Sequence, residues 1–537
     1  MAALAANDNL KKIKARASAA ASRKDLWASQ TDELFEYVIP FRKPVKARTG
    51  SQTEGEGRVN RVFDSTGIKA AQRFAGRMER DVTPPFQRFF ELKLGPAFNG
   101  DKQAREEIDV DLETVSAKVA ALLERSAFSI AASEMYLDLF GGTGCMLILE
   151  DEDDIAKFVS VPFYEVALRE DGYGKVVGIY WTKDFKADTL EGQWPEDKMQ
   201  ISDALRQIIN NKPNEDVTIC QATEYDRKTR KWVFTVYRPD AEEAPIYETQ
   251  MDTSPWITPR FYKVPGEVQG RGPGLMALPT IKTLNKVTEL SLKAAAFAIL
   301  GIWTYRQDRV FNPKTARMVP GAMWPVASNG GAYGKSVERM EVPGRFDLTN
   351  VIIQDLRMMV KEICLDDTLP ADSTAVKSAT EIMERMNRLM TDLSGAYGRL
   401  ALEIHIPLVQ RLLSILGRRG LIPDRLKIDQ TLLKLEIVSP LARAQNSQDA
   451  SSIINWLKIL LEIGGPEMMA LSAKVEEIGA VLGEKLGVAK SLMRGTDERK
   501  GLLQLVAKMI AAGQQQQSAP PEAPPANPQQ PGMMAAA

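Results

Sequence analysis

The chain has 537 residues, of which 44% are hydrophobic and 26% charged, as in ordinary soluble proteins of about three or four domains. Its 69 basic and 70 acidic residues give a formal net charge of -1. This balance excludes a polycation that grips nucleic acid, so any contact with DNA must be local, weak or transient. The three cysteines lack CxxC spacing and there is one histidine, so disulfides, zinc sites and histidine-based triads are not expected.

The N-terminal part of the chain is predicted to be helical. Residues 3–40 form a first helical stretch whose basic, Ala- and Ser-rich start is similar to a transit peptide, although a basic, exposed helix is the simpler interpretation. A second helix is expected in the segment that begins at residue 62, with caps at Asp64, Ser65 and Thr66 and a stop at Pro84-Pro85. A third covers 103–140 and ends at the glycine cluster GGTG, which lacks the lysine of a phosphate-binding loop and predicts a tight turn.

Residues 145–265 change to a period of two, which predicts an antiparallel sheet. The expected strands are 145–150, 158–170, 175–184, 217–226, 231–239 and 257–264. The acidic run EDEDD (150–154) is placed at a hairpin tip. Such a tip is normally solvated, and a metal site there is the less favoured alternative.

Beyond residue 275 the apolar spacing becomes helical again. Helices are expected at 277–300 and 347–365, on either side of an irregular, aromatic insert. The longest apolar run, 294–303, is too short to span a membrane. The insert contains Gly334-Lys335-Ser336, the ending of a nucleotide-binding loop, but Asn329 stands where that loop needs a glycine. A glycine-rich surface loop is therefore predicted here, not an ATP site.

The C-terminal part is predicted to be helical up to a polar tail. A helix over 379–417 is capped at Ser378 and kinked at Pro407. It contains His405, which lies between two isoleucines and is interpreted as a packing residue, not a catalytic base. Residues 441–512 are mostly helical, and the Gln-, Pro- and Ala-rich end is expected to be disordered.

The ordered set of segments resembles the portal, or head-to-tail connector, proteins of short-tailed bacteriophages. The likeness rests on VFDSTGIKAAQRFAGRMERDVTPPFQRFF (from 62), YLDLFGGTGCMLILE (from 136), GEVQGRGPGLMALPTIKTLN (from 266) and the helix that begins ATEIMERMNRLM (from 379). It spans roughly residues 25 to 420. The C-terminal region matches only in being helical with a loose tail.

This resemblance implies a mainly helical α+β subunit with the parts of a portal protein. They are an α+β wing (1–276), a first stem helix (277–300), a clip (301–346), a second stem helix (347–365), a channel loop (366–380), a long wing helix (381–430), a helical crown (431–512) and a disordered tail (513–537). The subunits would form a ring, typically dodecameric, at one capsid vertex. Double-stranded DNA would be packaged and ejected through this ring, which would need no cofactor, metal ion or catalytic residue.

The resemblance also implies partners and a location. The expected partners are further copies of the chain, the large terminase subunit of the packaging motor, tail adaptor and tail proteins, and major capsid and scaffold proteins, with internal virion proteins as further candidates. No membrane is expected. The location is the portal vertex of the virion, with the host cytoplasm during assembly.

Three groups of residues are the candidate functional sites. In the channel loop, Lys377 with Ser373, Thr374 and Ser378 would form a sparse positive ring that centres DNA, or else an ordinary solvated surface loop. In the clip, seven basic residues against three acidic ones lie among aromatics, a composition typical of protein interfaces. The clip residues predicted to meet the motor or tail adaptor are Arg306, Arg309, Arg317, Trp324, Tyr333, Lys335 and Arg339.

The stem helices carry the third site, an apolar stripe on each helix. Neighbouring subunits are expected to pack there through Leu284, Leu290, Ile352 and Leu356. Aspartate at position 284 or 356 would then abolish the ring and leave the body folded.

Two other functions are left open. One is a metal-dependent nucleic-acid-processing enzyme that uses Asp151 and Asp153 of the acidic run. The other is a scaffold component of a capsid without a DNA channel.

Overall fold

Two compact units make up the described chain. The computed structural model describes residues 2–42, 45–46, 52–53, 62–85, 87–94, 102–151, 154–195, 199–242, 244–300, 302–305, 337–340, 346–366, 395–396, 398–422, 433–437, 440–472, 475–486 and 488. Unit 1 comprises Met1–Leu92 and Thr114–Ser439, and unit 2 comprises Lys93–Glu113 and Pro440–Ala537.

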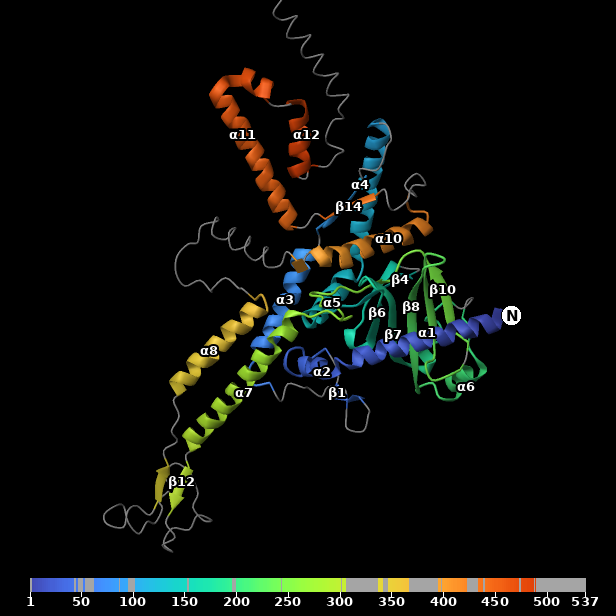
Figure 1. The fold of residues 1–537 in the computed structure, drawn as a ribbon, viewed down its shortest axis with the longest axis vertical. Coiled ribbons are helices and arrows are strands. Elements are labelled where there is room, and N and C mark those ends of the chain that lie inside the picture. The colour runs from blue at the N-terminus through green and yellow to red at the C-terminus, as the bar shows by residue number, and fades with distance from the viewer. Residues whose placement is uncertain are drawn as a thin grey trace, which may run out of the picture. The chain divides into compact units, whose positions relative to one another are not determined.

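A five-stranded antiparallel sheet lies in unit 1 (Figure 1). Its strands are β6 (Val166–Glu170), β7 (Val176–Lys186), β8 (Asp216–Asp226), β9 (Lys231–Tyr237) and β10 (Tyr247–Met251). They are ordered β10-β9-β8-β7-β6, so each strand pairs with its neighbour in sequence. The predicted antiparallel sheet is confirmed, with β10 as a strand that the sequence pattern did not indicate.

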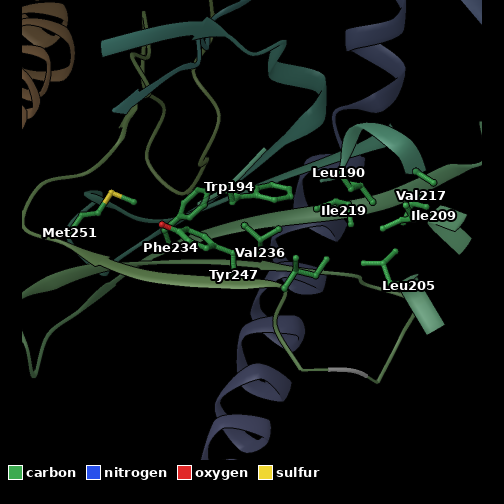
Figure 2. Packing of buried hydrophobic residues seen from close by; sticks show 12 residues of the cluster. Leu190, Trp194, Leu205, Ile209, Val217, Ile219, Phe234, Val236, Tyr247 and Met251 are labelled. Carbon is green, nitrogen blue, oxygen red and sulfur yellow. The ribbon is translucent and has the colours of Figure 1, made fainter. Parts of the chain in front are cut away.

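Both faces of this sheet are covered. On one face, helix α6 (Asp203–Asn211) contributes Leu205 and Ile209 to a core with Ile219, Phe234 and Val236 (Figure 2). On the other face lies helix α1 (Ala2–Asp25), which buries Leu10, Ile13 and Ala20 against β6, β7 and β8. The prediction of an exposed N-terminal helix is therefore wrong for this face of α1. The apolar residues of this face recur at helical spacing and complete the core of the sheet.

A second, three-stranded antiparallel sheet has the order β11-β4-β5. Strands β4 (Met146–Asp151) and β5 (Ile155–Ser160) form the hairpin predicted around the acidic run, and β11 is short (Trp256–Ile257). The single strand expected over 158–170 is divided between the two sheets, because Pro162 begins a turn of 3-10 helix at Phe163–Glu165.

The helices mostly follow the predicted stripes but are shorter. Their bounds in unit 1 are α2 (Ala28–Tyr37), α3 (Thr66–Val82), α5 (Phe128–Gly141), α7 (Pro273–Leu300), α8 (Phe346–Ile363) and α10 (Ile406–Arg418); α4 (Lys102–Arg125) spans the boundary between the units in sequence. The helix expected over 103–140 breaks at Ser126, whose hydroxyl accepts a hydrogen bond from the Phe128 amide at 3.3 Å. A π turn at Ala401–His405 ends one residue before Pro407 is reached at the second position of α10, and Pro407 has no N–H to continue the regular ladder.

Short strand pairs complete the described fold. They are β1 (Val45–Lys46) with β2 (Gln52–Thr53), β3 (Phe90–Leu94) with β14 (Leu433–Ile437), and β12 (Ile302–Tyr305) with β13 (Val337–Met340). In unit 2, α11 (Pro440–Ser472) is followed by α12 (Val475–Leu486), and α11 is interrupted at Gly465, whose φ is 67°. The predicted C-terminal tail lies outside the described residues. The fold is thus mainly helical α+β, as the sequence predicted.

Candidate functional site

Helices α7 and α8 form a hairpin that extends away from α3 and α5 and carries β12 and β13 at its far end (Figure 1). Large apolar side chains are exposed along both helices. On α7 they include Leu290, Leu292, Phe297 and Ile299, and on α8 they include Leu348, Val351, Ile352, Met358 and Met359. Ile299 is 80% and Val351 65% exposed. Many exposed large apolar side chains on one helical hairpin are typical of a protein interaction site.

The four predicted stem-packing residues are placed differently from one another. Leu290 and Ile352 are exposed, and Leu356 is half-buried. Leu284 is 1% exposed within its own subunit, near the base of the hairpin. An aspartate at 284 would therefore damage the subunit itself, and the expectation that this substitution leaves the body folded needs correction.

The base of the hairpin is held by residues 63–66 at the start of α3, here called the FDST segment. The side-chain oxygen of Asn285, on α7, accepts hydrogen bonds from the amides of Phe63 at 2.6 Å and Asp64 at 3.2 Å. The buried carboxylate of Asp64 accepts from the Arg357 guanidinium, on α8, at 2.8 Å and from the Thr66 amide at 2.8 Å. One short segment thus links both helices of the hairpin to α3.

The charge of Asp64 is maintained by these partners. Burial alone would raise the pKa of Asp64, but the hydrogen bonds from Thr66 and Arg357 outweigh burial and lower the pKa below its ordinary value of 3.8. The carboxylate is therefore ionised at neutral pH. Its contribution to stability is complete above pH 3.8 and is lost as the pH falls through the lower folded-state value.

Replacing Asp64 by asparagine is expected to lower the free energy of unfolding by about 2 kcal/mol, since hydrogen bonds to a charged group become neutral ones. Urea denaturation at pH 7 measures this loss. Asp240→Asn, which changes an exposed carboxylate, serves as the control and should stay within about 0.5 kcal/mol of the parent. Equal stability of the two variants would contradict the role given to Asp64.

A second set of contacts fixes the C-terminal end of α8 on α3. Arg73 pairs with the buried carboxylate of Asp366 at 2.8 Å, and Arg77 donates to the Leu365 carbonyl at 2.7 Å. Together with the FDST contacts, they hold the base of the hairpin on α3 through specific polar interactions.

The glycine cluster GGTG (141–144) packs against a second glycine cluster, formed by Gly270 and Gly272, that directly precedes α7. A Cβ on Gly142 would lie 2.7 Å from the amide nitrogen of Gly272, and the Gly142 φ of +124° already requires glycine. Gly270 donates its amide to the Thr143 hydroxyl at 2.9 Å. Because the backbones of the two clusters occupy this space, the cluster GGTG is a packed turn, as predicted, and not a phosphate cradle.

The single histidine is a packing residue, as the sequence predicted. The His405 ring is 3% exposed, its Nε2 donates to the Val82 carbonyl at 2.8 Å, and it contacts the Phe89 ring. Burial lowers the pKa of His405 to about 4.

This lowered pKa gives the protein a pH dependence in a defined window. Since the unfolded ring has a pKa of 6.5, stability is complete above that value and falls by about 3 kcal/mol as the pH drops from 6.5 towards 4. Carbon-13 NMR of the labelled imidazole, which gives one signal in this chain, measures the folded-state pKa directly. A midpoint near 6.5 in the folded protein would contradict the buried, neutral ring.

The acidic hairpin tip is partly neutralised inside the subunit. Glu150 pairs with Arg418 at 3.0 Å and with Arg419 at 3.6 Å, and Arg419 also donates to the Asp151 carbonyl. Among the described residues, which do not include Asp153, no three His, Cys, Asp or Glu side chains are grouped as a metal site requires. The described part of the acidic run therefore gives no support to the metal-dependent enzyme.

Two of the predicted sites fall almost wholly outside the described residues. These are the channel-loop residues Ser373, Thr374, Lys377 and Ser378, and the clip residues Arg306, Arg309, Arg317, Trp324, Tyr333 and Lys335. Arg339 lies in β13, where its backbone is opposite Trp303 of β12.

One helix in the described part of the chain, Gly398–Arg418, is long and apolar enough to cross a membrane by length and composition. Half of its most apolar window is buried within the protein. Leu400, Ile404, Leu408 and Leu412 are all at most 1% exposed, and the Arg411 guanidinium donates to the Ile148 carbonyl. These contacts are those of a core helix.

An α+β body with a protruding helical hairpin, exposed apolar side chains on that hairpin and a base held by polar contacts has the features of a subunit that assembles with others. The chain belongs to the bacteriophage head-to-tail connecting protein family, whose sequence model matches residues 10–493.

Individual relatives agree with this assignment. The chain is 23% identical over 473 residues to a probable portal protein of Bordetella phage BPP-1, covering 83% of this chain and 82% of the relative. It is 21% identical over 508 residues to the portal protein of Salmonella phage epsilon15, covering 90% and 88%.

Two solved structures are similar to the chain. One is the virion of a native gene transfer agent particle, with a TM-score of 0.37 at 12% identity, covering 82% of this chain and 95% of that one. The other is the neck of an empty gene transfer agent particle, also with a TM-score of 0.37 at 12% identity, covering 79% of this chain and 92% of that one.

Proposed function

We propose that this protein is the portal subunit of a phage, which assembles into a ring at one vertex of the capsid. Double-stranded DNA enters and leaves through the ring, and the tail is attached to it. The observation that carries this proposal is the exposed apolar surface on α7 and α8 of a chain that belongs to the head-to-tail connecting family. A single subunit leaves that surface in water, and neighbouring copies would cover it.

The ring is built by the same contact repeated around an axis. Contacts of this kind are heterologous, so one surface of a subunit meets a different surface of the next. Apolar side chains are exposed on both helices of the hairpin, and each hairpin can therefore present one surface to each neighbour. The contacts of Asp64 and Asn285 at the base fix the angle at which each hairpin leaves its body.

The passage of DNA requires weak contacts. The net charge of -1 over 537 residues is compatible with sliding, because each phosphate neutralised by a cation adds affinity. We assign the centring of DNA to Lys377, together with Ser373, Thr374 and Ser378 of the channel loop. One cation per subunit would give a sparse positive ring that does not arrest the DNA.

The segment between α7 and α8 is the proposed docking surface for other proteins of the phage. Its basic and aromatic residues, including Arg309, Trp324 and Arg339, would meet the large terminase subunit during packaging and the tail adaptor afterwards. Capsid and scaffold proteins would contact the ring while it assembles in the host cytoplasm, and hydrolysis of ATP would belong to the motor.

The mass and shape of the purified protein test this function. Light scattering and negative-stain microscopy should show a particle of many subunits with a central hole. A compact monomer of 59.5 kDa at all concentrations would contradict a self-assembling portal. A large particle without a hole would favour the capsid scaffold instead.

A further inference from the structure

A pocket of about 390 Å³ lies in unit 1 where α1 ends and α2 begins. One wall is β6, and another is the loop that leads into α7. The side chains that define its character are Arg23, Lys24, Trp27, Leu168, Gln269 and Arg271. None of the residues proposed to form the ring or to contact DNA lines this pocket.

The pocket carries a positive charge. Arg23, Lys24 and Arg271 supply three cations and Glu267 one carboxylate, so the lining has a net charge of +2. Glu267 is engaged by the Arg271 guanidinium at 2.6 Å. The same guanidinium lies 5.2 Å from the centre of the Trp27 ring and is thereby held in place. Arg23 is exposed at the rim, and Lys24 donates to the Tyr164 carbonyl at 3.0 Å. An anionic group is the expected ligand.

An apolar rim completes the set of features. Leu26 is 83% exposed beside the half-buried ring of Trp27. A ligand that matches both features needs a negative charge and an apolar side chain close together. An acidic peptide has carboxylates and apolar side chains within a few residues. The backbone of DNA carries phosphates but no apolar side chain that would cover Leu26.

We infer that this pocket binds a short acidic peptide segment that carries an apolar residue next to its carboxylates. A carboxylate of the peptide would lie between Arg23 and Lys24, and the apolar side chain would cover Leu26. The site is complete within one subunit, so its test is independent of ring formation.

Fluorescence anisotropy with two labelled peptides tests the inference on the full-length protein. The acidic probe is GLDELDG, and the matched neutral probe is GLNQLNG. The acidic probe is expected to bind at least about tenfold more tightly. Arg23→Glu should weaken its binding by about tenfold, which corresponds to one favourable charge pair reversed.

The control is Arg206→Glu, which makes the same charge change on an exposed residue of α6 outside the pocket. It is expected to leave the affinity unchanged, and all variants are first compared by thermal unfolding. Equal binding of the two probes, or equal effects of Arg23→Glu and Arg206→Glu, would overturn the inference. So would a 20-base-pair DNA duplex that displaces the acidic probe from the parent but not from Arg23→Glu, since the ligand would then be nucleic acid.

Discussion

Gly272→Ala is expected to destabilise the folded protein severely. A Cβ on Gly272 would overlap the carbonyl oxygen of Phe140 and lie 2.5 Å from the amide nitrogen of Gly142. Both are backbone atoms at the end of α5, so no side chain can move aside to relieve the overlap. The body of the protein would have to shift at the junction from which α7 starts. We expect a loss of more than about 4 kcal/mol, a range that only severe clashes and comparable defects reach.

Chemical denaturation of the soluble fraction measures this loss, and Gly76→Ala provides the matched control. Gly76 lies within α3, where a Cβ would meet no heavy atom within 4 Å. Because alanine has a higher helix propensity than glycine, this variant should be more stable by about 1 kcal/mol. If Gly272→Ala unfolded at the denaturant concentration of the parent, the close packing of the two glycine clusters would be disproved.

The glycine clusters also show where inference from sequence reaches its limit. A turn at 141–144 follows from local composition, and it is found there, with Gly142 at positive φ. That this turn packs against Gly270 and Gly272 depends on a contact across about 130 residues, which no local pattern encodes. Sequence reasoning could exclude phosphate as the occupant of the turn but could not identify the second backbone that fills it.

The FDST segment shows the same limit of inference from local sequence, here for polar residues. Asp64, Ser65 and Thr66 were predicted as helix caps, and α3 does begin at Thr66. The larger role of Asp64 is its pairing with Arg357, 293 positions away in sequence. The order of the segments indicated the family, but only the fold shows that this motif holds the two helices of the hairpin.

Apolar periodicity predicted the helices of the hairpin but not which apolar residues face a neighbour. Leu284 and Leu290 belong to the same predicted stripe, yet the first is buried in its own subunit and the second is 53% exposed. The difference arises because α3 covers only the base of the hairpin, where Ile281 approaches Gly67. Periodicity identifies the apolar face of a helix, whereas tertiary packing determines which part of that face is covered by the same subunit and which part stays exposed.

The double variant Leu290→Asp with Ile352→Asp is therefore expected to remain folded and to lose the ring. Leu290 is 53% and Ile352 44% exposed in the single subunit, so their replacement removes little buried surface within it. At a contact between subunits, each buried leucine or isoleucine contributes about 1.5–3 kcal/mol, and an aspartate there would also be buried without a partner. Because every contact between neighbouring subunits loses the contribution of both side chains, assembly should fail completely.

Light scattering and circular dichroism together distinguish assembly from folding. The double variant should have the mass of a monomer, 59.5 kDa, with the helical signal and unfolding midpoint of the parent subunit. Leu284→Asp is the contrasting variant, because it places a charge in the subunit's own core and should lower the unfolding midpoint. Intact rings from the double variant would show that the exposed parts of α7 and α8 do not mediate assembly, and the interface would then have to be sought on another surface of the subunit.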